Sequence, residues 1–415
     1  MERPSWWLML VVLLLGLLFL REPRLRRYDE IFLRWLLKNS VVENVQPPLT
    51  IVEIGHAQGA PKQNPESGSA ADFLRGTASA NSPLEAALFL QAALQFKPTV
   101  VAFEPVLQWP ENAQDEEQVF VDQAMRVPKL LLAAELTATP DPDAPVADIP
   151  GFSQVSGRRG DLVEFSGIAR QPNEDVRLLS TLGFVNLPSD IADDIHVPLL
   201  FQYRGEVIPS FALQALLLWL RVSPAEVKIK LGKEIELPQG RTIPIETDGT
   251  VVINPNAANA ARRVNLNELL LAAQQREQGK RVRTLDEMRD QVVLARGAAG
   301  AIKGADVFAA TIATIQTNSF IRRVSWIFDC VFLVIVSAIS GSLRRFSRID
   351  LLLGAIAFSA GYLLIALGIL TRWSIWLPGV LPLGALWVAV LFCFILPKPK
   401  LSTRTVAVAA SPPIP

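Results

Sequence analysis

Two carboxylates at the ends of apolar runs are the first residues that could do chemistry. Glu53 lies near the end of the run Leu49–Ile54, and Glu104 directly follows the run Thr99–Phe103. Both runs are rich in β-branched residues, which predicts buried strands of a parallel sheet. Ligands of open α/β sheets bind outside the carboxyl ends of the strands, so we expect the two glutamates to border one crevice. The alternative is that each carboxylate caps a neighbouring helix.

A short acidic segment is the second candidate. Asp190, Asp193, Asp194 and His196 offer oxygen and nitrogen ligands of the kind that hold a divalent cation. The same residues also fit a solvated turn between two strands, and the sequence places no further ligand group beside them. We therefore take these four residues and the two strand-end glutamates as ligand-binding candidates. We expect no catalytic residue, no bound cofactor and no metal centre.

The common enzyme classes find little support in the composition. Two cysteines and two histidines in 415 residues leave few nucleophiles and metal ligands. The segment Gly297–Gly304 resembles a phosphate-binding loop, but Gly304 follows Lys303 where Ser or Thr would bind magnesium. No Gly-x-Gly-x-x-Gly, Gly-x-Ser-x-Gly or His-Glu-x-x-His motif is present. A net charge of +0 argues against nucleic acid as a partner. We predict that the protein is not an enzyme.

Apolar runs at both ends of the chain indicate the elements that hold this domain. The chain is 50% hydrophobic with a mean hydropathy of +0.30. The hydrophobic residues gather in four runs, and these predict membrane-spanning helices over residues 6–20, 324–343, 351–370 and 376–396. The first run fits an uncleaved anchor better than a cleaved signal, because no small-residue cleavage site follows it. Pro378 and Pro382 predict kinks in the last run.

The basic residues of short loops predict the orientation of these helices. Arginines and lysines concentrate in the loop 344–350 and in the tail 397–415, which are therefore expected in the cytoplasm together with residues 1–5. The mildly acidic middle, residues 21–323, is then outside. Four arginines in the segment 21–27 contradict this orientation, but two consistent basic loops outweigh one.

The middle of the chain alternates predicted strands with predicted helices, which indicates an α/β domain with helices covering a sheet. Further strands are predicted over residues 130–133, 183–187 and 291–295. Helices are predicted over residues 82–96, 113–125 and 210–220. Turn residues in the stretch 228–253 predict hairpins. The Pro-, Gly- and Ser-rich stretches 56–82 and 137–175 are predicted to be loops.

The order of these features resembles the second class of CHASE domains, which are extracytoplasmic sensors associated with bacterial cyclases and histidine kinases. The resemblance covers nearly the whole chain. It is carried by Tyr28-Asp29 and Arg34-Trp35 after the first span, by the strand that ends in Glu104-Pro105, and by Ile208-Pro209-Ser210-Phe211. It also includes Asp248-Gly249, Val292-Val293-Leu294 before Gly297, and the three C-terminal spans. The family's Asp-x-Asp-Gly segment corresponds here only to 190–196, without the glycine.

The resemblance implies a bacterial inner-membrane protein whose external domain senses a small molecule or an envelope signal. The tail 397–415 is too short for a kinase or cyclase domain, so a separate membrane kinase or cyclase is the expected partner, together with the lipid bilayer and a second copy of the chain. Small residues in the spans, among them Gly354 and Gly361, suit close helix contacts. The alternative function is a membrane scaffold that uses the same fold without sensing.

Overall fold

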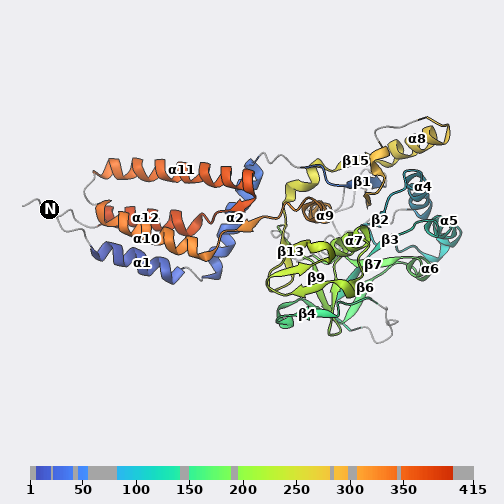
Figure 1. Cartoon of the computed structure of the whole chain (residues 1–415), viewed down its shortest axis with the longest axis horizontal. Helices are drawn as coiled ribbons and strands as arrows, with labels where there is room; N and C mark the ends of the chain where they lie inside the picture. The colour runs from blue at the N-terminus through green and yellow to red at the C-terminus, as the bar shows by residue number, and fades with distance from the viewer. Residues whose placement is uncertain are drawn as a thin grey trace, which may run out of the picture. The chain divides into compact units, whose positions relative to one another are not determined.

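The chain divides into two compact units (Figure 1). One is Val42–Ile321, here called the sheet unit, and the other combines Met1–Val41 with Arg322–Pro415, here called the helical unit. The computed structural model describes residues 6–19, 22–40, 45–54, 82–140, 149–187, 195–280, 285–297, 306–343 and 347–395. The sheet unit begins later than the residue 21 expected from the sequence, because a helix over Pro23–Asn39 packs with the C-terminal helices.

A largely parallel sheet forms the centre of the sheet unit. Its parallel strands, in spatial order, are β15 (Arg262–Asn265), β1 (Leu49–Ile54), β16 (Val292–Gly297), β2 (Val100–Phe103), β3 (Leu130–Thr137) and β7 (Thr181–Phe184). One further strand, β6 (Gly167–Arg170), pairs antiparallel with the end of β3. The sheet is thus built from segments at both ends of the unit. The predicted strands at 49–54, 99–103, 130–133 and 291–295 are confirmed, whereas β7 lies slightly earlier than 183–187.

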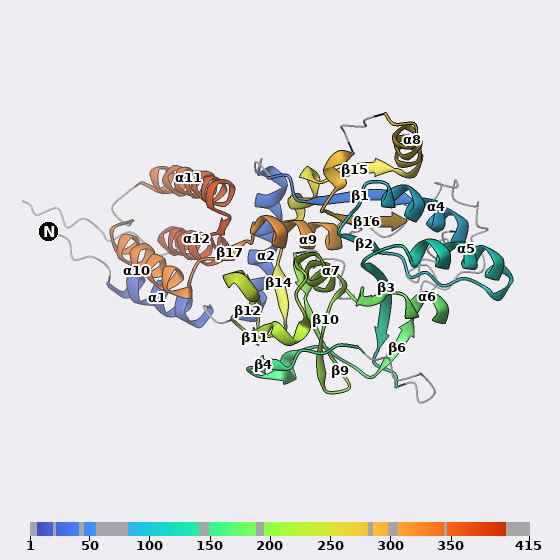
Figure 2. The ribbon, with the colours of Figure 1, turned by 45° about the vertical axis from the view of Figure 1, so that its right-hand side comes forward.

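Helices cover both faces of this sheet, as Figure 2 shows. The helices α4 (Pro83–Leu94), α5 (Gln114–Ala124) and α8 (Leu266–Glu277) share a core with Val52 and Ile54 of β1. The helices α7 (Phe211–Leu220) and α9 (Val307–Thr317) share the other core, with Leu49 and Ile51. Alternate side chains of each strand therefore enter different cores, which explains the nearly continuous apolar runs. The prediction of an α/β domain is confirmed.

Short strands outside the main sheet complete the unit. They are β4 (Gln154–Ser156), β5 (Glu164–Phe165), β8 (His196–Pro198), β9 (Leu200–Tyr203), β10 (Glu206–Pro209), β11 (Lys228–Lys230), β12 (Glu234–Glu236), β13 (Thr242–Pro244) and β14 (Thr250–Val252). β11, β12 and β13 form the hairpins predicted within 228–253. The prediction of a loop over 137–175 is wrong in part, because β4 and β5 form by pairing with the distant strands β11 and β9. Of the other predicted loop, residues 56–81 lie outside the described part of the chain.

Short helical turns connect several of these elements. They are η1 (Glu111–Ala113), η2 (Arg159–Asp161), α6 (Glu174–Leu178), η3 (Pro224–Glu226), η4 (Pro238–Gly240), η5 (Pro255–Ala260) and η6 (Asp286–Met288).

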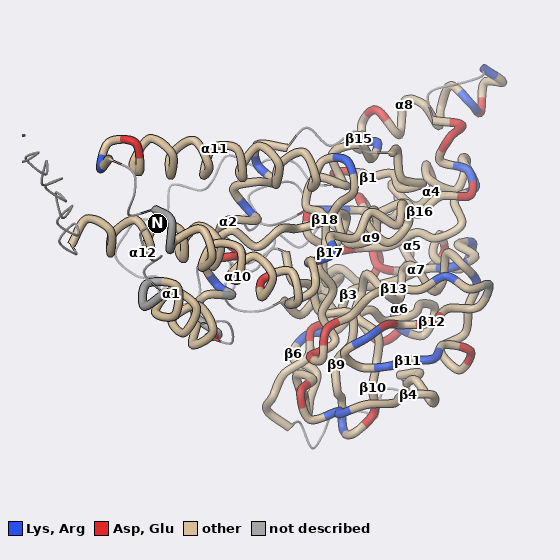
Figure 3. Tube along the Cα trace, turned by 60° about the vertical axis from the view of Figure 1, so that its left-hand side comes forward, with Lys and Arg blue, Asp and Glu red and all other residues tan. Residues whose placement is uncertain are grey.

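The helical unit contains α1 (Trp6–Phe19), α2 (Pro23–Asn39), α10 (Trp326–Leu343), α11 (Arg348–Trp373) and α12 (Val380–Ile395). α1 runs antiparallel to α10: the Ser337 hydroxyl donates to the Met9 carbonyl at 2.5 Å, and Gly16 packs against Leu333. Two short strands, β17 (Arg322–Arg323) and β18 (Ile375–Trp376), pair in parallel just before α10 and α12. In Figure 3 the helices α1, α10, α11 and α12 are uncharged over most of their length, whereas α2 carries charged residues throughout.

Length and composition qualify one described helix, α11, to cross a membrane. The apolar stretches of three others, Met9–Phe19, Ile327–Ser340 and Val380–Ile395, are shorter. The fourth apolar run becomes helical at Val380 rather than at residue 376, because β18 and Pro378 precede the helix; Pro382 lies in its first turn.

Candidate functional site

Glu53 and Glu104 lie at the same edge of one sheet, as expected from the sequence. Glu53 is the next-to-last residue of β1 and is in register with Arg296 of β16. On the other side of β16, Ala295 is in register with Phe103, and the Glu104 N–H donates to the Ala295 carbonyl at 3.0 Å. All three strands are parallel, so this edge is their carboxyl edge, the usual place for a ligand in an open α/β sheet.

The three charged residues of this edge extend from one face of the sheet. Ile51, Leu294 and Ala102 belong to the core beneath α7 and α9. Residues two positions further along a strand point to the same side, so Glu53, Arg296 and Glu104 follow on that face. The face is therefore apolar along the strands and becomes charged where the strands end. The helix-capping alternative is not seen for the helices that follow these strands, since residue 82 is the N-cap of α4 and residue 113 that of α5.

Glu104 is the most unusual group at this edge. Its Oε2 atom is buried, and no described residue forms a hydrogen bond with it. Burial raises the pKa of the Glu104 carboxyl to about 7; the nearby Arg296 opposes this rise and Asp306 adds to it. The carboxyl is therefore close to half protonated near neutral pH. It can donate or accept a hydrogen bond that no described residue takes up.

Two arginines and one aspartate form an ion-paired group beside Glu104. Asp306, the residue before α9, accepts from Arg296 Nη1 at 2.5 Å and from Arg263 Nη2 at 2.9 Å. The Arg296 side chain is 11% exposed, whereas those of Arg263 and Asp306 are 38% and 42% exposed. Asp306 thus holds the two guanidinium groups of β15 and β16 at the carboxyl edge. The arrangement can bind a polar group, and it presents no nucleophile with a general base.

The acidic candidates are only partly visible. Asp190, Asp193 and Asp194 lie outside the described residues. His196 begins β8, which pairs with β14, and its Nε2 lies 3.8 Å from Glu246 Oε1. It is in neither the main sheet nor the charged group at its carboxyl edge. In the described ranges no group of three or more His, Cys, Asp or Glu side chains is arranged to hold a metal ion.

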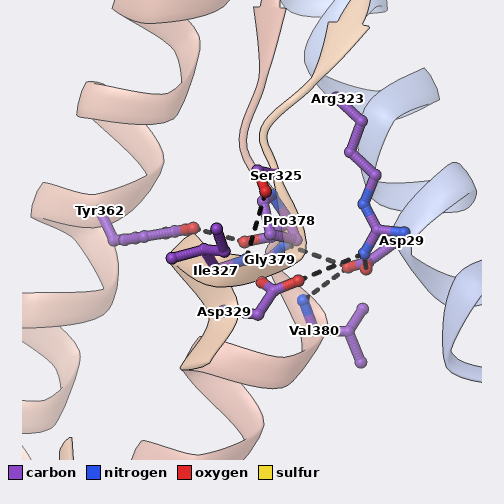
Figure 4. A network of polar contacts seen from close by, with 9 residues as sticks. All are labelled: Asp29, Arg323, Ser325, Ile327, Asp329, Tyr362, Pro378, Gly379 and Val380. Carbon is purple, nitrogen blue, oxygen red and sulfur yellow. Dashed lines mark hydrogen bonds and ion pairs between the residues drawn. The ribbon is translucent and has the colours of Figure 1, made fainter. Parts of the chain in front are cut away.

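A second polar network lies in the helical unit (Figure 4). Asp29 of α2 accepts from the backbone N–H groups of Gly379 and Val380 at 3.1 and 2.9 Å, at the start of α12. Its other oxygen lies 3.2 Å from Arg323 Nη2, which is also 3.7 Å from Asp329 Oδ2. The side chains of Asp29 and Asp329 are only 3% and 7% exposed. Buried charges of this kind persist only when they are paired and hydrogen-bonded.

Asp329 lies close to Arg323 and is buried within the unit. Its Oδ1 atom has no hydrogen-bond partner among the described residues. On the neighbouring helix, the Tyr362 hydroxyl donates to the Pro378 carbonyl. This network anchors α2 to the start of α12.

Several of these residues escaped the sequence analysis. Arg263, Arg296 and Asp306 join only because β15 and β16 lie on either side of β1, which a strand prediction alone does not reveal. Asp29 was noted only as part of a motif. Arg296 directly follows the predicted strand over residues 291–295, and this position could have marked it as a candidate for the carboxyl edge of the sheet. Comparisons of the chain with protein-family models, curated proteins and solved structures find no match.

Proposed function

We propose that the protein is a membrane-anchored receptor of the bacterial inner membrane, with the sheet unit outside the cytoplasm. The proposal joins the resemblance to the second class of CHASE domains with the charged carboxyl edge of the sheet. α1, α10, α11 and α12 act as the four membrane-spanning helices. The length of α11 and the uncharged middle stretches of the other three support this role.

The observation that carries the receptor function is the buried Oε2 of Glu104 beside Arg296, an atom that has no hydrogen-bond partner among the described residues. A buried polar atom without a partner costs free energy, so it calls for an explanation such as a bound ligand, ion or water. A small polar ligand that hydrogen-bonds to Glu104 and to the guanidinium of Arg296 would recover this free energy. The function is binding rather than catalysis, and the signal passes to a separate membrane kinase or cyclase.

A ligand screen tests this function. The full chain in lipid nanodiscs is heated with a panel of small polar metabolites, and compounds that raise the unfolding temperature are kept. We expect such compounds to lose their effect in Glu104→Gln and in Arg296→Gln. Glu111→Gln, an exposed glutamate in η1, is the matched control and should respond as the wild type does. Stabilisation that is the same in all four proteins would contradict the proposed site.

A further inference from the structure

One face of α2 exposes apolar and aromatic side chains that no described residue of the helical unit covers. Tyr28, Ile31 and Trp35 are 57%, 53% and 49% exposed. Their spacing of three and four residues places them in one stripe along the helix. Arg27 and Lys38 are both exposed and lie along one side of the stripe. Arg27 is four residues before Ile31, and Lys38 is three residues after Trp35.

The opposite face fixes the rotation of α2 about its axis. Leu33, Leu36 and Leu37 are buried, and α2 contacts both α11 and α12. Asp29, on the same side, holds the backbone N–H groups at the start of α12. The ring of Phe32 lies so close to Gly379 that a Cβ there would be 2.5 Å from it. The stripe cannot turn inward without breaking these contacts.

The position of α2 within the helical unit places the stripe at a defined level. α2 meets the unit at the end where α11 finishes and α12 begins, and Figure 1 shows it steeply inclined to both. If α11 crosses the bilayer, this end of the unit is at the bilayer surface, and α2 runs along that surface. This position of α2 at the bilayer surface rests on the proposed membrane location.

We infer that α2 is an interfacial helix that inserts Tyr28, Ile31 and Trp35 into the headgroup and upper acyl region of the adjoining leaflet. Tyrosine and tryptophan are enriched at this level, because their rings are apolar at one end and polar at the other. The cationic groups of Arg27 and Lys38 reach the lipid phosphates while their stems stay along the apolar stripe. The occupant of the stripe is thus phospholipid, since the stripe continues from a membrane-spanning helix and its flank is basic.

Spin labels on the full chain test the inference. The chain is placed in nanodiscs that contain a zwitterionic phospholipid together with the anionic lipid phosphatidylglycerol. The background carries Cys330→Ser and Cys393→Ser, and single cysteines replace Ile31, Leu364 or Leu271. Leu364 is exposed on α11, and Leu271 is exposed on α8 of the sheet unit, so it serves as the water control. We expect the Ile31 label about 5–10 Å below the phosphates. The Leu364 label should lie deeper, and the Leu271 label should lie in water.

The labels distinguish three results that would contradict the interfacial role of α2 or the membrane location on which it rests. An Ile31 label in water beside a deep Leu364 label overturns the interfacial role of α2 alone. A Leu364 label in water overturns the membrane location itself. Shielding of Ile31 in native membranes but not in pure lipid indicates a protein occupant and also overturns the inference.

A measurement on the chain with its native cysteines guards against a background that fails to fold. Lipids brominated near the headgroup quench tryptophans at that depth, and wild type is compared with Trp35→Phe. We expect the brominated lipid to quench a larger part of the tryptophan fluorescence in the wild type than in Trp35→Phe, because only the wild type has a tryptophan at residue 35. Equal quenching of the two proteins contradicts the inference.

Discussion

Replacing Glu104 by glutamine should change how the stability of the sheet unit depends on pH. The carboxyl has its ordinary pKa of 4.5 in the unfolded chain and a pKa of about 7 in the folded one. A raised folded-state pKa contributes stability that is fully present below pH 4.5 and is lost as pH rises towards 7 and above. At about 1.36 kcal/mol per pKa unit, the loss is roughly 3 kcal/mol. Glutamine keeps the shape of the side chain but cannot ionise.

The assay is urea unfolding of the full chain in detergent micelles, followed by fluorescence. Trp109 and Trp219 report on the sheet unit. The quantity of interest is the free energy of unfolding of wild type minus that of Glu104→Gln, measured from pH 4.5 to pH 8, because other titrating groups cancel in this difference. We expect the difference to fall by roughly 3 kcal/mol across the range. A difference that stays constant would refute the burial and the raised pKa of Glu104.

Two further changes probe the helical unit. Asp29→Ala leaves two backbone N–H groups and a guanidinium without their acceptor, so thermal unfolding in micelles should show a free energy of unfolding that is lower by about 2–3 kcal/mol. Asp29→Asn should recover part of this loss. A free energy of unfolding that is unchanged in Asp29→Ala would contradict the network. A Cβ added at Gly354 or at Gly361 meets no atom within 4 Å, so we expect the fold to persist in Gly354→Leu with Gly361→Leu while single-molecule subunit counting shows weaker self-association. Gly384→Leu, equally open, is the control, and unchanged association of the double variant would exclude this face of α11.

The sequence predicted the elements whose patterns are local. The strand that contains Glu53 and the strand before Glu104 are largely apolar runs, and the helix that becomes α4 begins with serine, proline and an acidic first turn. These signals depend on neighbouring residues only. The shared sheet edge of the two glutamates followed from the parallel strands that these signals indicate.

The remaining features depend on pairing between distant segments. β16 inserts between β1 and β2, which brings Arg296 between the two glutamates, and no local pattern encodes that order. β4 and β5 are too short to stand out from the loops around them. The sequence does not reveal α2 as a helix, because its arginines resemble a basic loop after the first span. If α2 is the interfacial helix inferred above, these arginines do not report on orientation as loop residues do.

The central claim is that the sheet unit lies outside the cytoplasm, and a topology reporter tests it most directly. A reporter that is active only outside the cytoplasm is inserted at Ser153, an exposed residue of the sheet unit, and at Ser347, the N-cap of α11. The account predicts activity at Ser153 and none at Ser347, with the reverse pattern for a cytoplasmic reporter. Cytoplasmic reporter activity at Ser153 would contradict it.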